Sequence, residues 1–293
     1  MAKKDFMSLT IKDSFMFYAV MSDPEQCRRL LTLVLDMEIE TVTVHREETI
    51  IYHPDYHSIR LDVTAIEHGT RRRFNVEMQS QTEKEIARRS RYYHSQLDSD
   101  ALLSSHDYDE LPDTYVIFIC DFDPVGAGLY RYCYQMTCRE TGTALGDGTQ
   151  TIFLSTKGKN KDAVPPELVS FLEYVRDPAT REQTEDSFVS SLDTQISTIK
   201  RDREWRSKYM LLEIMMAKER KEGREEGISR GELRKVIDLC CCKLSKGKSA
   251  EEIADALECG LSEINAIVEA AQKYAPDYDV DRILEELCGE NQQ

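Results

Sequence analysis

The sequence predicts an α/β fold in which a mixed central sheet is flanked by helices, followed by an all-helical C-terminal region. Helix and strand signals occur in the order helix, strands, helix, strand, which is compatible with a sheet covered by helices. Residues 114–120 are almost wholly apolar, as a strand buried on both faces should be. From about Leu168 onward the pattern is helical. At 293 residues the chain is long enough for one sizeable core and a smaller appended unit.

Two helices are expected before the first strand. The first begins near Asp13, because residues 10–13 (TIKD) resemble a capping box. The second begins at Asp23 and Pro24, an N-cap followed by proline at the first helical position. Its apolar residues recur at i, i+3, i+4 and i+7, and the buried face should comprise Cys27, Leu30, Leu31 and Val34. A strand-like stretch follows at residues 41–51.

Residues 58–63 (SIRLDV) and 74–79 (FNVEMQ) are predicted to form two paired strands. Side chains on a strand alternate between its two faces. In the first strand Leu61 and Val63 share one face, which leaves Asp62 on the other. In the second strand the apolar face comprises Phe74, Val76 and Met78, and the polar face comprises Asn75, Glu77 and Gln79. A turn at residues 67–70, with Gly69 at positive φ, would bring Asp62 and Glu77 onto one polar face.

A helix follows these strands. Residues 82–85 (TEKE) form another capping box, and Ile86, Tyr93 and Leu97 make an apolar stripe. Tyr92, Tyr93 and His94 suggest catalysis, but an aromatic stripe at helical spacing favours a place in the core. Two further strands, at residues 128–138 and 151–154, should extend the sheet.

Asp62 and Glu77 have the chemistry of a metal site. Paired carboxylates suit Mg²⁺, which takes oxygen ligands and keeps several waters. The backbone carbonyl of Met78 could add a third oxygen, and Gln79 could orient an attacking water or touch a scissile phosphate. The alternative is that both acids are ordinary solvent-facing residues of a two-sided sheet, which is the favoured interpretation for a bare D, E-x-Q match.

Several ordered motifs beyond this match give the chain a resemblance to a known family. It resembles the Rpn family of recombination-promoting nucleases, also classed as transposases, of the PD-(D/E)XK phosphodiesterase superfamily. The resemblance covers roughly residues 5 to 235. The motifs are DSF at 13–15, RLDV at 60–63, VEMQ at 76–79, RSRYYHSQLD at 89–98, YVIFICDFDPVG at 115–126, LGDG at 145–148, IFLSTKG at 152–158 and KEGREEGISRGE at 221–232.

The resemblance implies a PD-(D/E)XK-like fold and a Mg²⁺-dependent DNA endonuclease that hydrolyses phosphodiester bonds, linked to recombination or mobile elements. Asp62 and Glu77 would be the metal ligands, and Mn²⁺ can substitute for Mg²⁺. Gln79 stands where the wider superfamily usually has a catalytic lysine, although the Rpn-like family itself has E-x-Q. A neutral amide lacks the lysine's charge. Another cation, Lys84, Arg88 or Arg91 on the following helix, is expected to supply it.

Asp13 is a further candidate metal ligand, because it matches an acidic position in the family's first helix. The capping role described above is the favoured alternative. The family usually has Phe-Lys where this chain has Phe15 and Met16.

The net charge of −16 argues against a nucleic-acid partner, because Lys and Arg drive phosphate binding. The basic residues nevertheless cluster at residues 71–73 beside the hairpin and at Arg88, Arg89 and Arg91 on the next helix. Arg73, Arg88 and Arg91 are therefore the candidate DNA-binding residues. A solvated face without DNA contacts is the equally open alternative.

The nine cysteines lack a Cys-x-x-Cys pair and do not form a zinc signature. Their odd number, with no secretory signal, predicts a reducing cytoplasmic location. Cys240, Cys241 and Cys242 are expected to be small buried residues of a helix. No run of 18 apolar residues exists, so no membrane span is predicted.

Three segments are expected: a nuclease domain at residues 1–190, a charged helical linker at 191–232 and a small helical module at 233–293. Glycines recur every fourth residue at 223–231, which indicates a linker or a surface for close helix contact, and we favour the linker. Two capped helices at residues 249–274 resemble a helix-turn-helix, but the second contains acids that phosphates would repel. A helical interaction module, through which copies of the chain could associate, is favoured.

Two classes of function therefore remain open. The first is an active Mg²⁺-dependent endonuclease. The second is a catalytically weak or inactive nuclease-fold protein that binds nucleic acid or protein, a view motivated by Gln79, Met16 and the net negative charge. Strand transfer by a DNA 3′ hydroxyl, rather than hydrolysis by water, is a third possibility.

Overall fold

The computed structural model of the chain describes residues 4–45, 63–82, 84–102, 107–183 and 185–289. It divides into two compact units, Met1–Ile214 and Met215–Gln293. In the described part of the first unit, six strands form one sheet in the order β1-β2-β3-β4-β6-β5. They are β1 (Val42–His45), β2 (Val63–Glu67), β3 (Arg73–Gln79), β4 (Thr114–Cys120), β5 (Arg131–Tyr134) and β6 (Thr149–Ser155).

The predicted hairpin is confirmed where it is described. β2 and β3 pair antiparallel, with Val63 opposite Val76 and Thr64 opposite Asn75. Gly69 lies in the turn at φ +87°, a conformation that glycine adopts without strain. Asp62 and the rest of residues 58–62 lie outside the described residues, as does the predicted strand beyond His45. The shared face of Asp62 and Glu77 therefore stays a prediction.

Beyond the hairpin the sheet is parallel, which makes it mixed as predicted. β3 pairs with β4 and β4 pairs with β6 in parallel register, whereas β5 runs antiparallel to β6. Gln79 lies beside Cys120, and Cys120 lies beside Ser155, so these three strands end together at one edge. Every residue of β4 is buried, in agreement with a strand covered on both faces.

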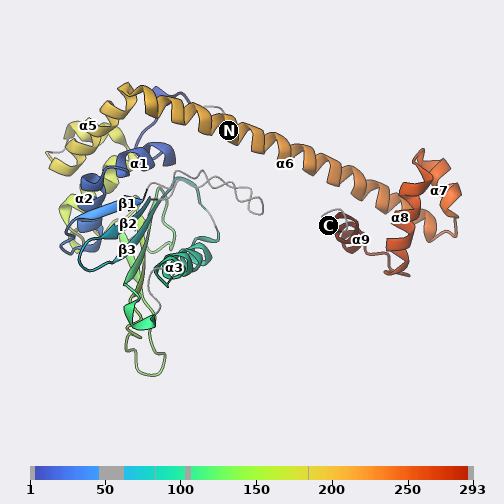
Figure 1. Cartoon of the computed structure of the whole chain (residues 1–293), viewed down its shortest axis with the longest axis horizontal. Coiled ribbons are helices and arrows are strands. Elements are labelled where there is room, and N and C mark those ends of the chain that lie inside the picture. Colours follow the sequence, from blue (N-terminus) through green and yellow to red (C-terminus); the bar gives the residue numbers. More distant parts are fainter. Residues whose placement is uncertain (1–3, 46–62, 83, 103–106, 184, 290–293) are drawn as a thin grey trace. The chain divides into compact units, whose positions relative to one another are not determined.

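Helices cover the two faces of this sheet (Figure 1). One face packs against α1 (Ser14–Met21), α2 (Pro24–Leu35), α4 (Pro166–Arg176) and α5 (Ser187–Arg201). The other packs against α3 (Ile86–Leu102), where Tyr93 and Leu97 meet Phe118 of β4. Short 3₁₀ helices are η1 (Phe6–Ser8), η2 (Tyr108–Glu110), η3 (Lys161–Ala163) and η4 (Pro178–Gln183).

The predicted start of α2 is confirmed in its cap and in its buried face. The Asp23 carboxylate accepts hydrogen bonds from the backbone N–H groups of Glu25 and Gln26, and Pro24 is the first helical residue. The four residues of the predicted apolar face are all buried, namely Cys27, Leu30, Leu31 and Val34. Local capping and periodicity were sufficient to place this helix.

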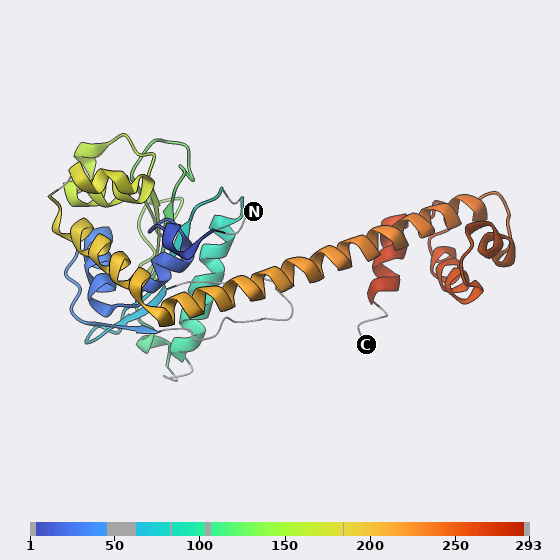
Figure 2. The same ribbon diagram turned by 90° about the horizontal axis from the view of Figure 1, so that it is seen from above.

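The long helix α6 (Arg203–Leu244) continues without a break through Gly223, Gly227 and Gly231 (Figure 2). A Cβ added at any of these three glycines would meet no atom within 4 Å in the described structure. No close contact within the described chain therefore requires glycine at these three positions. Each glycine lowers the stability of the helix.

The second unit is helical and has its own core. Besides the end of α6 it contains α7 (Ala250–Leu257), α8 (Leu261–Gln272) and α9 (Val280–Gly289). Ser249 and Glu252 form the predicted capping box of α7. The core includes Cys240 and Cys241, whereas Cys242 is exposed, so the expectation of burial was right for two of these three cysteines.

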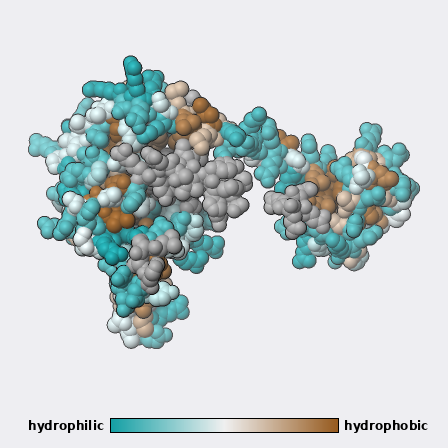
Figure 3. Space-filling model, viewed as in Figure 1, coloured by the Kyte–Doolittle hydropathy of each residue, from teal (hydrophilic) through white to brown (hydrophobic). Residues whose placement is uncertain are grey.

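The surface is mainly hydrophilic on the face shown in Figure 3, with hydrophobic residues exposed in separate small areas. Among the described residues, no helix is long and apolar enough to cross a membrane.

Replacing Gly227 by alanine should raise the stability of α6 by about 1 kcal/mol, since alanine is the better helix former and its Cβ enters open space. Thermal unfolding followed by circular dichroism at 222 nm measures this effect. Gly158→Ala is the contrasting variant, because its Cβ would clash with the ring and backbone of Tyr130. Destabilisation by Gly227→Ala would show that the glycine run makes a close contact.

Candidate functional site

A buried polar stripe runs along the side of β3 that faces α3. Asn75, Glu77 and Gln79 are 5%, 8% and 6% exposed, and they alternate with Phe74, Val76 and Met78 of the opposite, apolar face. This is the alternation predicted from the sequence. The neighbouring residues of β4 on the same side are apolar, namely Val116, Phe118 and Cys120. Glu77 and Gln79 therefore lie beside an apolar surface of β4.

The Glu77 carboxylate binds two nitrogen donors through the same oxygen. Gln79 donates from Nε2 to Glu77 Oε1, and Arg89 of α3 donates to that oxygen from Nη2. The side chains of Arg89 and Glu77 are only 19% and 11% exposed. A carboxylate so far removed from water requires a compensating cation, and Arg89 provides it.

Aromatic rings hold the Arg89 guanidinium in place. Its central carbon lies 5.7 Å from the ring centroids of both Tyr93 and Phe118, within the range of a cation–π contact. Arg89 also donates a hydrogen bond of 3.0 Å to the Tyr93 hydroxyl. The cation beside the Glu-x-Gln motif is thus fixed by α3 and β4 together.

Arg89 is not among the three residues that the sequence suggested for the catalytic charge, and which cation supplies that charge stays a prediction. Lys84, Arg88 and Arg91 are all exposed. Arg89 lies three residues after Ile86 and four before Tyr93, on the buried stripe of the helix. An arginine at an apolar position of an amphipathic helix is a signal that would have identified it.

The other predicted site residues are placed as follows. Asp62 lies outside the described residues, and Glu77 and Gln79 are in direct contact. The Met78 side chain is buried in the core of the opposite face, and its carbonyl remains only a predicted ligand. The Asp13 carboxylate accepts a 2.9 Å hydrogen bond from the Thr10 backbone N–H and pairs with Lys4. The bond to Thr10 is the one that the capping-box pattern predicted, but α1 begins at Ser14 and the Asp13 side chain does not cap it.

Arg73 and Arg88, two of the candidate DNA-binding residues, differ in their surroundings. Arg73 donates hydrogen bonds to the backbone carbonyls of Leu97 and Asp100 at the end of α3. Burial lowers the pKa of its guanidinium. Arg88, like Arg91, is exposed on α3. Arg73 therefore has a structural role in joining β3 to α3, which the sequence did not suggest.

Tyr93 and His94 of α3 have structural contacts, as expected. Tyr93 is 2% exposed, and the His94 ring nitrogens lie 2.8 Å and 3.1 Å from the hydroxyls of Thr114 and Thr151. Tyr92 differs from the expectation because it is 41% exposed. Nearby, burial together with the charge of Glu77 raises the pKa of the Cys120 thiol to about 12, so this cysteine is not a nucleophile at neutral pH.

The donor set on β3 is compatible with a hard divalent cation, because it offers a carboxylate and amide oxygens. The buried oxygen Asn75 Oδ1 has no hydrogen-bond donor within the part of the chain that the structure describes. The described residues contain no group of three acidic, histidine or cysteine side chains that could hold a metal ion by themselves. Asp62, which lies outside the described residues, stays the predicted second metal ligand.

Comparison with known proteins identifies the family. The family model described as PD-(D/E)XK nuclease family transposase matches residues 17–225, well over half of the chain. The chain therefore belongs to the PD-(D/E)XK nuclease family transposases, as the sequence motifs predicted. No curated protein and no solved structure matches the chain. The mixed sheet between helices is consistent with the PD-(D/E)XK fold, and membership supports a nuclease-like or transposase-like function.

Arg89→Met should lower the free energy of unfolding of the first unit by about 3 kcal/mol, because it removes the guanidinium from a buried carboxylate. Urea denaturation followed by the fluorescence of Trp205, the single tryptophan, measures this loss. Adding Glu77→Gln should recover part of it. Arg88→Met, on the exposed side of α3, is the matched control and should cost under about 0.5 kcal/mol. Strictly additive losses in the double variant would contradict a direct Glu77–Arg89 contact.

Stability should decrease as the pH falls below about 6.5, the ordinary pKa of histidine. Burial lowers the pKa of His94 and outweighs the opposing charge of Asp147. In that pH range the unfolded chain binds the proton and the folded chain does not, so protons favour unfolding. His94→Gln should flatten this part of the profile of unfolding free energy against pH. An unchanged slope would exclude His94 as its source.

Proposed function

We propose that the chain is a Mg²⁺-dependent DNA endonuclease that hydrolyses phosphodiester bonds, acts in the cytoplasm and takes part in recombination or in the movement of mobile elements. Mn²⁺ can replace Mg²⁺ in this proposal. The observation that supports it best is the buried Glu77 carboxylate, bound by Gln79 and Arg89 within the segment that matches the family. A buried charged group with two polar partners is typical of a functional site.

Asp62 and Glu77 would hold the ion, with the backbone carbonyl of Met78 as a third oxygen ligand. Asp62 directly precedes Val63, which pairs with Val76. Strand alternation therefore predicts that the Asp62 side chain points to the same side as Glu77. When bound, Mg²⁺ polarises a phosphoryl oxygen and lowers the pKa of a water ligand.

Gln79 is proposed to orient the attacking water or to contact the scissile phosphate. Its amide nitrogen donates to Glu77, and its amide oxygen can accept a hydrogen bond from a water. An amide can hold a water in this way but cannot neutralise negative charge. The reaction therefore needs a cation from elsewhere.

Arg89 is proposed to be that cation. A guanidinium stays charged at all working pH values and has five N–H donors, enough to bind Glu77, the Tyr93 hydroxyl and a phosphate oxygen. Its place on α3 brings the charge to the Glu-x-Gln motif from the helix rather than from the strand. Arg88 and Arg91, exposed on the same helix, would contact neighbouring DNA phosphates.

The full chain should nick or cleave supercoiled plasmid DNA with Mg²⁺ or Mn²⁺ and not with EDTA. Asp62→Ala and Glu77→Ala should each reduce the rate by about 100-fold or more, because each removes a group that positions the reacting charges. Agarose-gel assays of relaxed and linear product measure the rates. Asp109→Asn is the matched control, since it removes an exposed carboxylate of η2.

Equal residual cleavage by the wild type, Asp62→Ala and Glu77→Ala would contradict the proposal, because a contaminating nuclease would then be the source. Circular dichroism and Trp205 fluorescence show whether each variant is folded. Glu77→Gln provides a second test of the same position, since it keeps the side-chain shape and the polar contacts while removing the charge.

A second candidate is a nuclease-fold protein that binds DNA or protein without efficient cleavage. The Glu77–Arg89 contact favours it, because a cation already compensates the carboxylate that would bind the metal. Tight DNA binding without cleavage under any divalent ion would support this candidate. Strand transfer is distinguished by supplying a DNA 3′ end as the attacking group and looking for joined product.

We further propose that the chain self-associates through the helices of the C-terminal module. Double-strand cleavage favours a dimer, because two strands must be cut. The module's own core leaves exposed side chains such as Leu239 and Leu261 at 40% and 44%. Analytical ultracentrifugation of the full chain measures the oligomeric state.

A further inference from the structure

A second group of charges lies at the carboxyl edge of the sheet, where β3, β4 and β6 end together. Asp121, the residue after β4, donates its backbone N–H to the Gln79 carbonyl at 2.9 Å. Its carboxylate lies 2.7 Å from Lys12 Nζ and 3.4 Å from Lys157 Nζ. Two lysines thus share one carboxylate directly beside the Glu-x-Gln strand, which leaves a local excess of positive charge.

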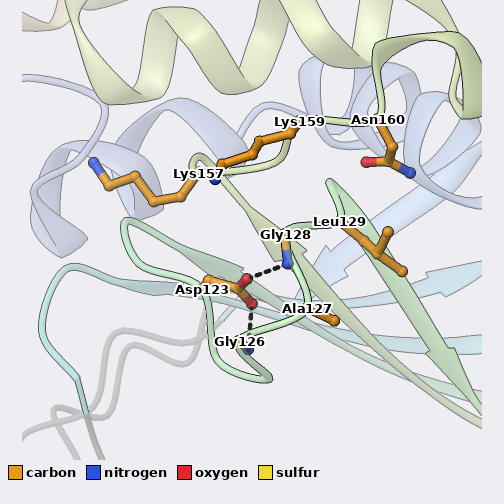
Figure 4. A pocket seen from close by; sticks show the side chains of 8 residues that line it. All are labelled: Asp123, Gly126, Ala127, Gly128, Leu129, Lys157, Lys159 and Asn160. Atoms are coloured by element: carbon orange, nitrogen blue, oxygen red, sulfur yellow. Dashed lines mark hydrogen bonds between the residues drawn. The ribbon is translucent and has the colours of Figure 1, made fainter.

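An open pocket of about 590 Å³ continues from this edge (Figure 4). Lys157, Lys159 and Asn160 line it from the loop after β6, and the loop between β4 and β5 lines it from the opposite side. Both lysines are exposed. No carboxylate within the described ranges pairs with Lys159. Its ammonium is therefore available to an incoming anion.

The walls of this pocket are preorganised. Asp123 accepts hydrogen bonds from the backbone N–H groups of Gly126 and Gly128 and from the Tyr132 hydroxyl, at 2.7 to 2.9 Å. These hydrogen bonds outweigh burial and lower the pKa of Asp123. The backbone N–H of Lys159 donates a hydrogen bond of 2.8 Å to the Gly128 carbonyl, which joins the two loops.

The pocket also has an oriented amide and a small apolar wall. Asn160 Oδ1 accepts the backbone N–H of Tyr130 at 2.8 Å, which fixes the orientation of its amide. Leu129 and Ala127 supply apolar surface, and the lysines supply charge. The Lys159 ammonium and the Lys157 ammonium, which contacts Asp121, are the phosphate donors of the pocket, while the Asp123 carboxylate is held by its own hydrogen-bond donors.

We propose that Lys157 and Lys159 form a phosphate-binding subsite for the DNA strand that reaches the Glu77–Gln79 site. This inference rests on the proposed function. β3 and β6 are separated by one strand, so their ends lie about 10 Å apart. The two lysines follow the end of β6, so the subsite would bind a phosphate on the same strand as the scissile bond and close to it.

The test is DNA binding without cleavage. Fluorescence anisotropy of a labelled duplex, titrated with the full chain in EDTA and in Ca²⁺ over a range of KCl concentrations, gives Kd and its salt dependence. The double variant Lys157→Ala/Lys159→Ala should bind at least about tenfold more weakly, and the slope of log Kd against log salt should fall by about 1.8, since each phosphate contact contributes about 0.9. Lys157→Arg/Lys159→Arg should bind like the wild type.

Lys161→Ala is the matched control. Lys161 is 60% exposed in the adjoining η3, and its ammonium lies 2.7 Å from Glu173. The control removes the same charge from a lysine that does not line the pocket, so the affinity for DNA should change less than about twofold. Wild-type binding in the double variant, an equal loss in Lys161→Ala, or no binding by the wild type would overturn the subsite.

The subsite and the proposed function can fail separately. Asp62→Ala should abolish cleavage and keep lysine-dependent binding. Cleavage that survives Asp62→Ala, with binding still dependent on the two lysines, would contradict the proposed metal site and support the subsite. Cleavage that requires Asp62, with DNA binding that does not depend on the two lysines, would support the proposed metal site and contradict the subsite.

Discussion

The Glu77 carboxylate is buried between β3 and α3, and this burial constrains the surrounding structure. An ionised carboxylate removed from water costs several kcal/mol unless a cation and hydrogen bonds compensate it. Arg89 and Gln79 provide that compensation, and Tyr93 and Phe118 hold Arg89 in place. Helix α3 must therefore pack on β3 and β4 in one register, because a shift of a single residue would separate the guanidinium from the carboxylate.

Strand β3 joins this polar site to the hydrophobic core. Its Phe74, Val76 and Met78 side chains belong to the core that α1, α2, α4 and α5 cover, while Glu77 and Gln79 face α3. The stability of the core thus fixes the position of the polar groups. The parallel register then places Asp121 and Lys157 at the same edge of the sheet as Gln79. The Glu77–Gln79 site and the proposed DNA-binding edge therefore both follow from the arrangement of β3, β4 and β6.

Much of this arrangement could be predicted from the sequence because the controlling interactions are local. Alternation placed Glu77 and Gln79 on one face, and the Asp23 cap placed α2. Non-local features were not accessible in this way. The pairing of β4 with β6 brings Lys157 to Asp121, and nothing in either segment alone indicates that contact. Arg89 lies between these cases, because its position on the apolar stripe of α3 was a local signal for a buried ion pair.

Membership of the PD-(D/E)XK nuclease family transposases leaves the means of catalysis to be explained, since the (D/E)XK motif of the family's name ends in lysine and this chain has Gln79 two residues after Glu77. We propose that the positive charge comes from Arg89 on the helix and that Asp62 and Glu77 hold the metal ion. A crystal structure of the protein soaked with Mn²⁺, with anomalous scattering to locate the ion, tests this most directly. The account predicts an ion bound by Asp62 and Glu77, with Gln79 in hydrogen-bond contact with a metal-bound water. An ion bound elsewhere, or Asp62 directed away from Glu77, would contradict it.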